Sequence, residues 1–207
     1  MKEERETNKH EEGVVKQLKS FMVIAIVTCF WAICAIPAQA EIVYNTKLLL
    51  HGTKQVSETS KFGISGWLII PNPGAKVTVA VAGPKYCGNN WWIEFNAGAF
   101  IKENKGEGMI DIRFSYDKKD PVHIWSNIEY FMDSQNWYTY LDANYRLGQI
   151  CLLGAETENM HFKDAVDDYG YGPRLVLPFK DGQFVLIGSY QFHSGPNQIW
   201  ARAVLNF

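Results

Sequence analysis

The chain contains few of the features that mark the commonest classes of protein. Of its four cysteines, only Cys87 and Cys151 follow residue 40. Export would permit a bond between these two, but they do not make a disulfide framework. Residues 1–40 hold five of the 20 basic and five of the 22 acidic side chains, which leaves 15 and 17. We therefore expect no nucleic-acid partner, because there is no basic excess.

Sequence motifs for catalysis, metals and cofactors are equally scarce. The sequence has no Gly-x-Ser-x-Gly elbow and no Cys or His pair with ligand spacing, and Gly170-Tyr171-Gly172-Pro173 does not open a helix as a phosphate site would. Three acidic residues form either a solvated loop or a Ca²⁺ site: Asp164, Asp167 and Asp168. We predict no metal site and no cofactor.

One apolar run stands near the start of the chain. Residues 21–36 carry no charge, Lys16 and Lys19 precede them, and Ala38-Gln39-Ala40 follows. A basic flank, a short apolar run and a small-x-small site are typical of a secretory signal peptide. The run is short for a membrane-spanning helix, which needs about 20 apolar residues. We predict that residues 1–40 are a signal peptide with a long charged n-region.

The remainder of the chain is rich in aromatic and β-branched residues and is divided by turn signals. Regular turns between short alternating runs predict an all-β sandwich or barrel. The expected strands are 62–71, 75–83, 90–101, 108–117, 121–133, 136–147, 149–158, 169–179, 183–193 and 197–207. Residues 61–207 would form this domain, and residues 41–60 would be a periplasmic lead-in or an extra strand.

Successive side chains of a strand point to opposite faces, and here one face is apolar while the other carries charges. Ile110, Ile112 and Phe114 share one face, for example, and Asp111 and Arg113 share the other. Two arrangements satisfy this pattern. A soluble, lipocalin-like barrel turns its apolar face inward, whereas a membrane barrel turns it outward to lipid. Expected strands of nine to twelve residues and aromatic residues near strand ends favour the membrane barrel.

The final strand resembles the closing strand of small bacterial outer-membrane β-barrel proteins. In that class a terminal Phe, with apolar residues at alternate positions before it, is recognised by the barrel-insertion machinery. The matching positions are Phe207, Leu205, Ala203, Ala201 and Ile199. The resemblance implies a single antiparallel, up-and-down transmembrane barrel of about ten strands (eight to twelve), located in the outer membrane and surrounded by its lipid.

This class suggests a topology in which Phe207 ends in the periplasm. An even number of strands would return the N-terminus to that side, and the longest connection, 159–170, would face outward. Short periplasmic turns and longer external loops are typical of such barrels.

A narrow barrel fills its lumen with side chains, and buried charges must be paired there. We expect an ion-pair network of Glu94, Asp111, Arg113, Glu129, Asp142, Arg146, Arg174 and Arg202. The favoured hypothesis is an outer-membrane barrel without an evident catalytic site, with a structural, adhesive or porin-like narrow-pore role. The alternatives are a soluble periplasmic binding barrel and a lipid-modifying hydrolase or acyltransferase, for which His193-Ser194 and His123 near Ser126 are the only candidates.

Overall fold

A computed structural model describes residues 41–117, 121–148 and 150–207 of the chain. The expected signal peptide, residues 1–40, lies outside the described residues. Within the described parts, no helix is long and apolar enough to cross a membrane. Two short 3₁₀ turns, η1 (Pro73–Ala75) and η2 (Lys180–Gly182), accompany the strands.

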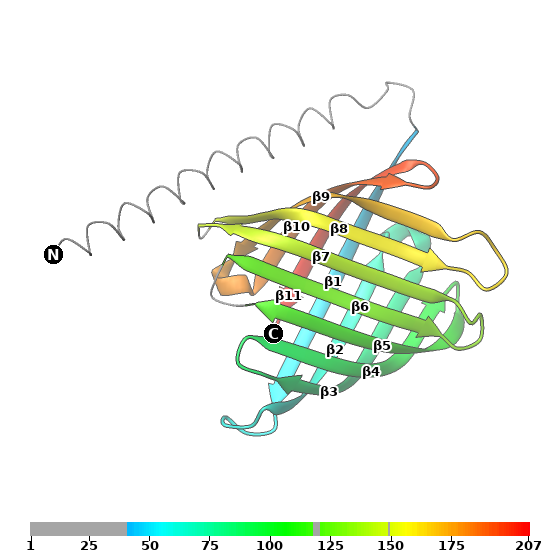
Figure 1. Ribbon diagram of the computed structural model, residues 1–207. Helices are drawn as coiled ribbons and strands as arrows, with labels where there is room; N and C mark the ends of the chain where they lie inside the picture. The colour runs from blue at the N-terminus through cyan, green and yellow to red at the C-terminus, as the bar shows by residue number, and fades with distance from the viewer. Residues whose placement is uncertain (1–40, 118–120, 149) are drawn as a thin grey trace, which may run out of the picture. The chain divides into compact units, whose positions relative to one another are not determined.

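The described residues form a closed, all-β barrel (Figure 1). The prediction of ten strands after residue 60 is confirmed in outline, and an eleventh precedes them. The strands are β1 (Ile42–Gln55), β2 (Phe62–Pro71), β3 (Val77–Cys87), β4 (Trp91–Lys102), β5 (Lys105–Asp117), β6 (Val122–Phe131), β7 (Trp137–Leu147), β8 (Cys151–His161), β9 (Asp168–Phe179), β10 (Phe184–His193) and β11 (Asn197–Asn206).

The barrel closes through β1, which pairs with β2 on one side and with β11 on the other. The β1–β2 pair is antiparallel, but β1 and β11 run parallel from Ile42–Asn197 to His51–Asn206. The prediction of an all-antiparallel barrel with an even number of strands is therefore wrong. The extra strand comes from residues 41–60. It must run parallel to β11, because the chain reverses its direction ten times between the two strands.

This closure places the two ends of the described barrel at opposite rims. We call the rim where β11 ends the C-terminal rim and the rim where β1 begins the N-terminal rim. The expectation that both ends of the barrel share one side is therefore wrong as well. The N-terminal rim carries the connections 72–76, 103–104, 132–136, 162–167 and 194–196.

The connection that we expected to be longest is shorter in the structure. Strand β8 extends to His161 and β9 begins at Asp168, which leaves 162–167 between them. The segment 56–61, between β1 and β2 at the opposite rim, has the same length. Loop length therefore does not distinguish the two rims in the way the sequence suggested.

Strand β3 continues through Gly83-Pro84, where we predicted a turn. The paired positions of β3 and β4 pass from Ala82–Ala97 to Lys85–Glu94 without a change of register, and the chain reverses only after Cys87. A proline is tolerated in a sheet where the ladder is locally interrupted. The longer strand brings Lys85 to the inner face.

Strand alternation places charged residues inside the barrel and apolar residues outside. Asp111, Arg113 and Asp142 are buried, whereas Ile112 and Leu141 are 37% and 47% exposed on the outer face. The interior also holds one apolar cluster: Trp67, Ile69, Val79, Val81, Met109 and Phe131. The inner face thus combines charged residues with apolar ones along β2, β3 and part of β5 and β6, and further apolar residues of β8 to β11, such as Leu152 and Val176, line the lumen nearer the C-terminal rim.

Two inward-facing glycines mark places where neighbouring strands approach closely. A Cβ atom on Gly98 would lie 1.9 Å from the backbone oxygen of Ala80, and one on Gly172 would lie 1.9 Å from that of Tyr190. Such glycines allow a sheet to bend sharply as it closes into a barrel. The small lumen therefore depends on positions that accept no side chain.

Candidate functional site in the barrel lumen

The lumen contains a cavity of about 1090 Å³ that is lined from both rims. Gly148, Lys180 and Asn206 line it near the C-terminal rim, while Pro71 and Met160 line it near the N-terminal rim. Its wall combines the apolar cluster with charged side chains and with aromatic rings, among them Trp125 and Tyr140. At about 1090 Å³ the cavity has room for a small solute.

One group of buried charges occupies the inner face of β3 to β6. Glu94 accepts a hydrogen bond from the indole N–H of Trp67 at 2.7 Å and lies 3.0 Å from the ammonium group of Lys85. Arg113 donates from Nε to Asp111 at 2.6 Å. Because these carboxylates and cations are buried together, each charge offsets the desolvation of its partner.

The guanidinium of Arg113 has aromatic neighbours as well. It lies 4.3 Å from the ring centre of Trp67 and 5.8 Å from that of Trp125. Its Nη2 atom is 3.7 Å from Glu129, a distance too long for a hydrogen bond. Neither Nη1 nor Nη2 has a hydrogen-bond partner among the described residues.

A second group of charges is centred on Glu156 of β8. Its carboxylate accepts hydrogen bonds from Tyr140 at 2.7 Å, Ser189 at 2.6 Å and Gln191 at 2.6 Å, and from Arg202 at 2.9 and 3.0 Å. The side chain of Glu156 is fully buried. A buried carboxylate with this many donors fixes four strands relative to one another.

Two further acids extend this group toward both rims. Arg174 donates to Asp142 and to the Tyr140 hydroxyl through close contacts. Glu158 lies 2.7 Å from Nη2 of Arg202 and 2.9 Å from the ammonium group of Lys47. The contacts of Arg202 join β11 to β8 across the lumen, because β9 and β10 lie between them.

The eight residues of the expected network all lie on inward positions, and seven of them are buried. Arg146 is half-buried and lines the cavity. The structure divides the seven buried residues between the two groups. Glu94, Asp111, Arg113 and Glu129 belong to the first, and Asp142, Arg174 and Arg202 belong to the second.

Four charged members of these groups were missing from the expected network: Lys47, Lys85, Glu156 and Glu158. Lys85 lies two residues beyond the expected strand 75–83, so a longer strand would have included it. Glu156 and Glu158 already lie in the expected strand 149–158, at alternate positions of its inward face. Lys47 lies in the strand that we left undecided.

The candidate catalytic residues do not form a nucleophile–base pair. His193 and Ser194 both contact Asp168 Oδ1 at 2.8 Å, and the hydroxyl of Ser194 is the donor. The other ring nitrogen of His193 lies 3.1 Å from the amide oxygen of Gln191. His123 and Ser126 lie on opposite faces of β6, as their odd and even positions require. The arrangement lacks the hydrogen bond between hydroxyl and imidazole that activation of a serine requires.

Asp167, the last residue of the 162–167 loop, and Asp168, the first residue of β9, bind different partners. Asp167 receives hydrogen bonds from the Tyr169 hydroxyl and the Phe162 backbone N–H and contacts His161, whereas Asp168 faces His193. These hydrogen bonds, the one from Tyr169 foremost, lower the pKa of Asp167. Among the described residues, no group of three His, Cys, Asp or Glu side chains is placed to hold a metal ion. Cys87 and Cys151 are both free thiols.

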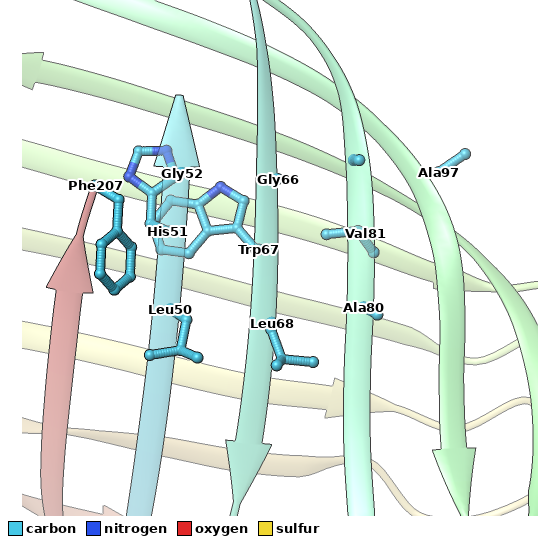
Figure 2. Close-up of a pocket in the computed structure, with 11 residues that line it drawn as sticks. Leu50, His51, Gly52, Gly66, Trp67, Leu68, Ala80, Val81, Ala97 and Phe207 are labelled. Atoms are coloured by element: carbon cyan, nitrogen blue, oxygen red, sulfur yellow. The ribbon is translucent and has the colours of Figure 1, made fainter. Parts of the chain in front are cut away.

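The terminal strand presents Ile199, Ala201, Ala203 and Leu205 on the outer face, whereas Trp200, Arg202 and Val204 line the lumen. The last residue, Phe207, is 78% exposed, and its backbone N–H donates to His51 of β1 at 2.9 Å. Figure 2 shows Phe207 beside β1. Phe207 borders an outer hollow of about 450 Å³. Small outward residues create this hollow: Gly52, Gly66, Ala80, Ala82 and Ala97.

Comparison with known proteins assigns the chain to no family. No known protein family matches the chain, and no curated protein matches it.

Proposed function

We propose that this chain is an integral barrel of the bacterial outer membrane, inserted by the barrel-insertion machinery, whose lumen offers a narrow path to small solutes. One observation carries the proposal: the closed barrel exposes apolar side chains and encloses its charges. Halfway along the strands, Phe95, Ile128 and Leu175 are 51%, 46% and 40% exposed on the outer face. A soluble binding barrel would bury such residues, since water-exposed apolar patches are rarely large.

The height of the barrel fits a bilayer. Strands of eleven residues, rising about 3.3 Å per residue and tilted by about 40°, give a barrel about 28 Å tall, and outer-membrane barrels have an apolar band about 25 Å tall. Exposed aromatic residues lie near strand ends at both rims, including Trp91 and Phe179 at one and Tyr44 and Trp137 at the other. Such residues favour the interface between headgroups and acyl chains.

Tryptophan quenching by brominated lipids tests the membrane placement with a matched pair on one strand. Trp91 points outward and is 39% exposed, whereas its neighbour Trp92 lines the lumen. In vesicles whose acyl chains carry bromine, we expect Trp91→Phe together with Trp137→Phe to remove most of the quenching. Trp92→Phe, the control, should not reduce the amount of fluorescence that is quenched.

The opposite dependence would contradict the membrane placement, as would release of the protein with soluble periplasmic contents. Sarkosyl insolubility and heat-modifiable migration on a gel are the expected behaviour in cell fractions.

A narrow solute path is the functional role that the cavity supports best, because lining residues come from both rims and the wall is charged. Planar-bilayer recording of the purified protein should give small, discrete conductance steps. Insertion without any conductance would leave a structural or adhesive role.

A further inference from the structure

The wall of the lumen cavity carries more positive than negative side chains. Among the residues that the structure describes, the lining cations are Lys47, Arg113, Arg146, Arg174, Lys180 and Arg202. The lining acids are Glu129, Asp142, Glu158 and Asp181. Asp111 and Glu156, which pair with Arg113 and Arg202, do not line the cavity. The guanidinium groups therefore face the cavity more directly than several of their counter-charges do.

The buried polar atoms of this wall that lack a hydrogen-bond partner among the described residues are mainly donors. Nη1 and Nη2 of Arg113, Nε of Arg174 and Nε of Arg202 are buried without a hydrogen-bond partner among the described residues. Buried N–H groups are costly when unpaired, and charged donors more so. A solute that accepts hydrogen bonds would satisfy them.

Aromatic rings connect these three arginines in one region of the wall. Trp125 and Tyr140 have ring centres 5.2 Å apart. Trp125 lies 5.8 Å from the guanidinium of Arg113, and Tyr140 lies 5.9 and 5.8 Å from those of Arg174 and Arg202. The guanidinium carbon of Arg113 lies over the ring of Trp67, which belongs to the apolar cluster.

We propose that the lumen binds small oxyanions at Arg113, with Arg174 and Arg202 beside it, and that it passes anions in preference to cations. A guanidinium with two free Nη groups matches the paired oxygens of a carboxylate or a phosphate. The apolar cluster beside it offers a surface to the body of an organic acid. The permeation part of this inference rests on the proposed membrane pore, whereas the binding part does not.

Titration of the protein in non-ionic detergent tests binding without a membrane. The probes are benzoate and inorganic phosphate, followed by the arginine Nε–H and indole N–H resonances, with benzamide as the uncharged control. Saturation by benzoate alone identifies organic carboxylates, and saturation by both probes identifies oxyanions in general. Absence of saturable shifts with both probes at millimolar concentrations overturns the proposal.

Two substitutions should move the affinity in opposite directions. Arg113→Gln should weaken binding by about tenfold or more, because it removes a charged bidentate donor. Glu129→Gln should tighten binding several-fold, because it removes the carboxylate 3.7 Å from Nη2. Lys54→Gln, an equal charge change at an exposed position outside the cavity, should leave the affinity unchanged.

Arg113→Gln leaves Asp111 without its partner, so folding needs its own control. The pair Arg113→Gln with Asp111→Asn removes both charges, and it should fold and still bind weakly. Arg113→Lys keeps the positive charge but loses the two Nη groups that can bind a pair of oxygens. This variant should also bind more weakly than the wild type.

Reversal potentials in a KCl gradient then test permeation, with chloride favoured in the wild type and the preference reduced in Arg113→Gln. Cation preference in a conducting wild type overturns the permeation part of the inference while leaving the membrane pore intact. Saturable binding without insertion would contradict the pore alone.

Discussion

Glu156 is the side chain on which the second group of lumen charges depends most, and Glu156→Gln tests that dependence. The amide keeps the shape of the side chain but has one acceptor oxygen in place of two. Its NH₂ group is best placed at Oε2, because Oε1 accepts from three neighbours, among them Ser189 and Gln191. The hydroxyl of Tyr140 then loses its acceptor, and one of the two contacts with Arg202 is lost.

The expected destabilisation follows from these losses. Hydrogen bonds to charged groups contribute about 1.5–3 kcal/mol each, and breaking a buried ion pair by removing one partner costs about 3–5 kcal/mol. Arg202 keeps Glu158, and Arg174, whose Nη1 lies 3.4 Å from Glu156, keeps Asp142, so we expect a value near the lower end. That value is about 3 kcal/mol. Urea unfolding in lipid vesicles, followed by tryptophan fluorescence and gel migration, measures it.

A double-mutant cycle makes this test specific to the network. Arg202→Gln alone should also destabilise the barrel, and the double variant should lose less than the sum of the two. Thr157→Val, on the outer face next to Glu156, is the control and should change the stability by less than about 1 kcal/mol. A Glu156→Gln variant as stable as the wild type, or strictly additive effects, would refute the assignment of Glu156 as the centre of the group.

Three further predictions concern the backbone, the orientation and the loop. Gly172→Ala should destabilise the barrel by about 1–3 kcal/mol or prevent its closure, because the added Cβ would collide with the carbonyl oxygen of Tyr190. Gly195→Ala, whose added Cβ has no neighbour within 4 Å, should be neutral in the same urea assay. If the C-terminal rim faces the periplasm, an impermeant maleimide should label Gly195→Cys, made in a cysteine-free background, on intact cells. In a second protein that keeps the native Cys151, the same reagent should reach this cysteine only after permeabilisation. The reverse pattern would invert the orientation. Since the pKa of Asp167 is lowered, its hydrogen bonds stabilise the 162–167 loop fully above the ordinary aspartate pKa of about 4, and this stabilisation is lost as the pH falls through the lowered value. Amide exchange at Phe162, corrected for intrinsic exchange, should therefore accelerate on acidification in the wild type. In Asp167→Asn the corrected exchange should be independent of pH in this range.

Most strands and the face of nearly every strand residue could be predicted from the sequence, because a period of two is a local property. The residues Trp137 to Leu147 alternate without interruption, and β7 has those bounds. Strand β3 was cut short because Gly83-Pro84 is a turn signal in most contexts. Only its pairing with β2 and β4 holds that dipeptide in an extended conformation.

The closure of the barrel and the contacts inside it could not be predicted in this way. The apolar residues Leu48, Leu49 and Leu50 occupy both faces of β1, so alternation does not reveal that strand, and its partner β11 lies at the other end of the chain. The contact between Arg202 and Glu156 crosses the lumen. Which inward residues meet across a barrel depends on strand number and shear, and neither is encoded in a single strand.

The two groups of lumen charges also restrict how the strands can pair. A shift of one residue in any pairing would reverse the faces of a strand and carry a charge such as Arg174 or Glu156 to the outer surface. In a bilayer that exposure is costly, about 2–4 kcal/mol for an arginine at the midplane. Arg174 and Arg202, which we propose to attract oxyanions, would therefore also fix the register of β9 and β11, as Glu156 would fix that of β8. For this reason Arg113, whose Nη groups have no hydrogen-bond partner, is a better place to separate solute binding from folding than Arg174 or Arg202, whose Nη groups bind carboxylates on other strands.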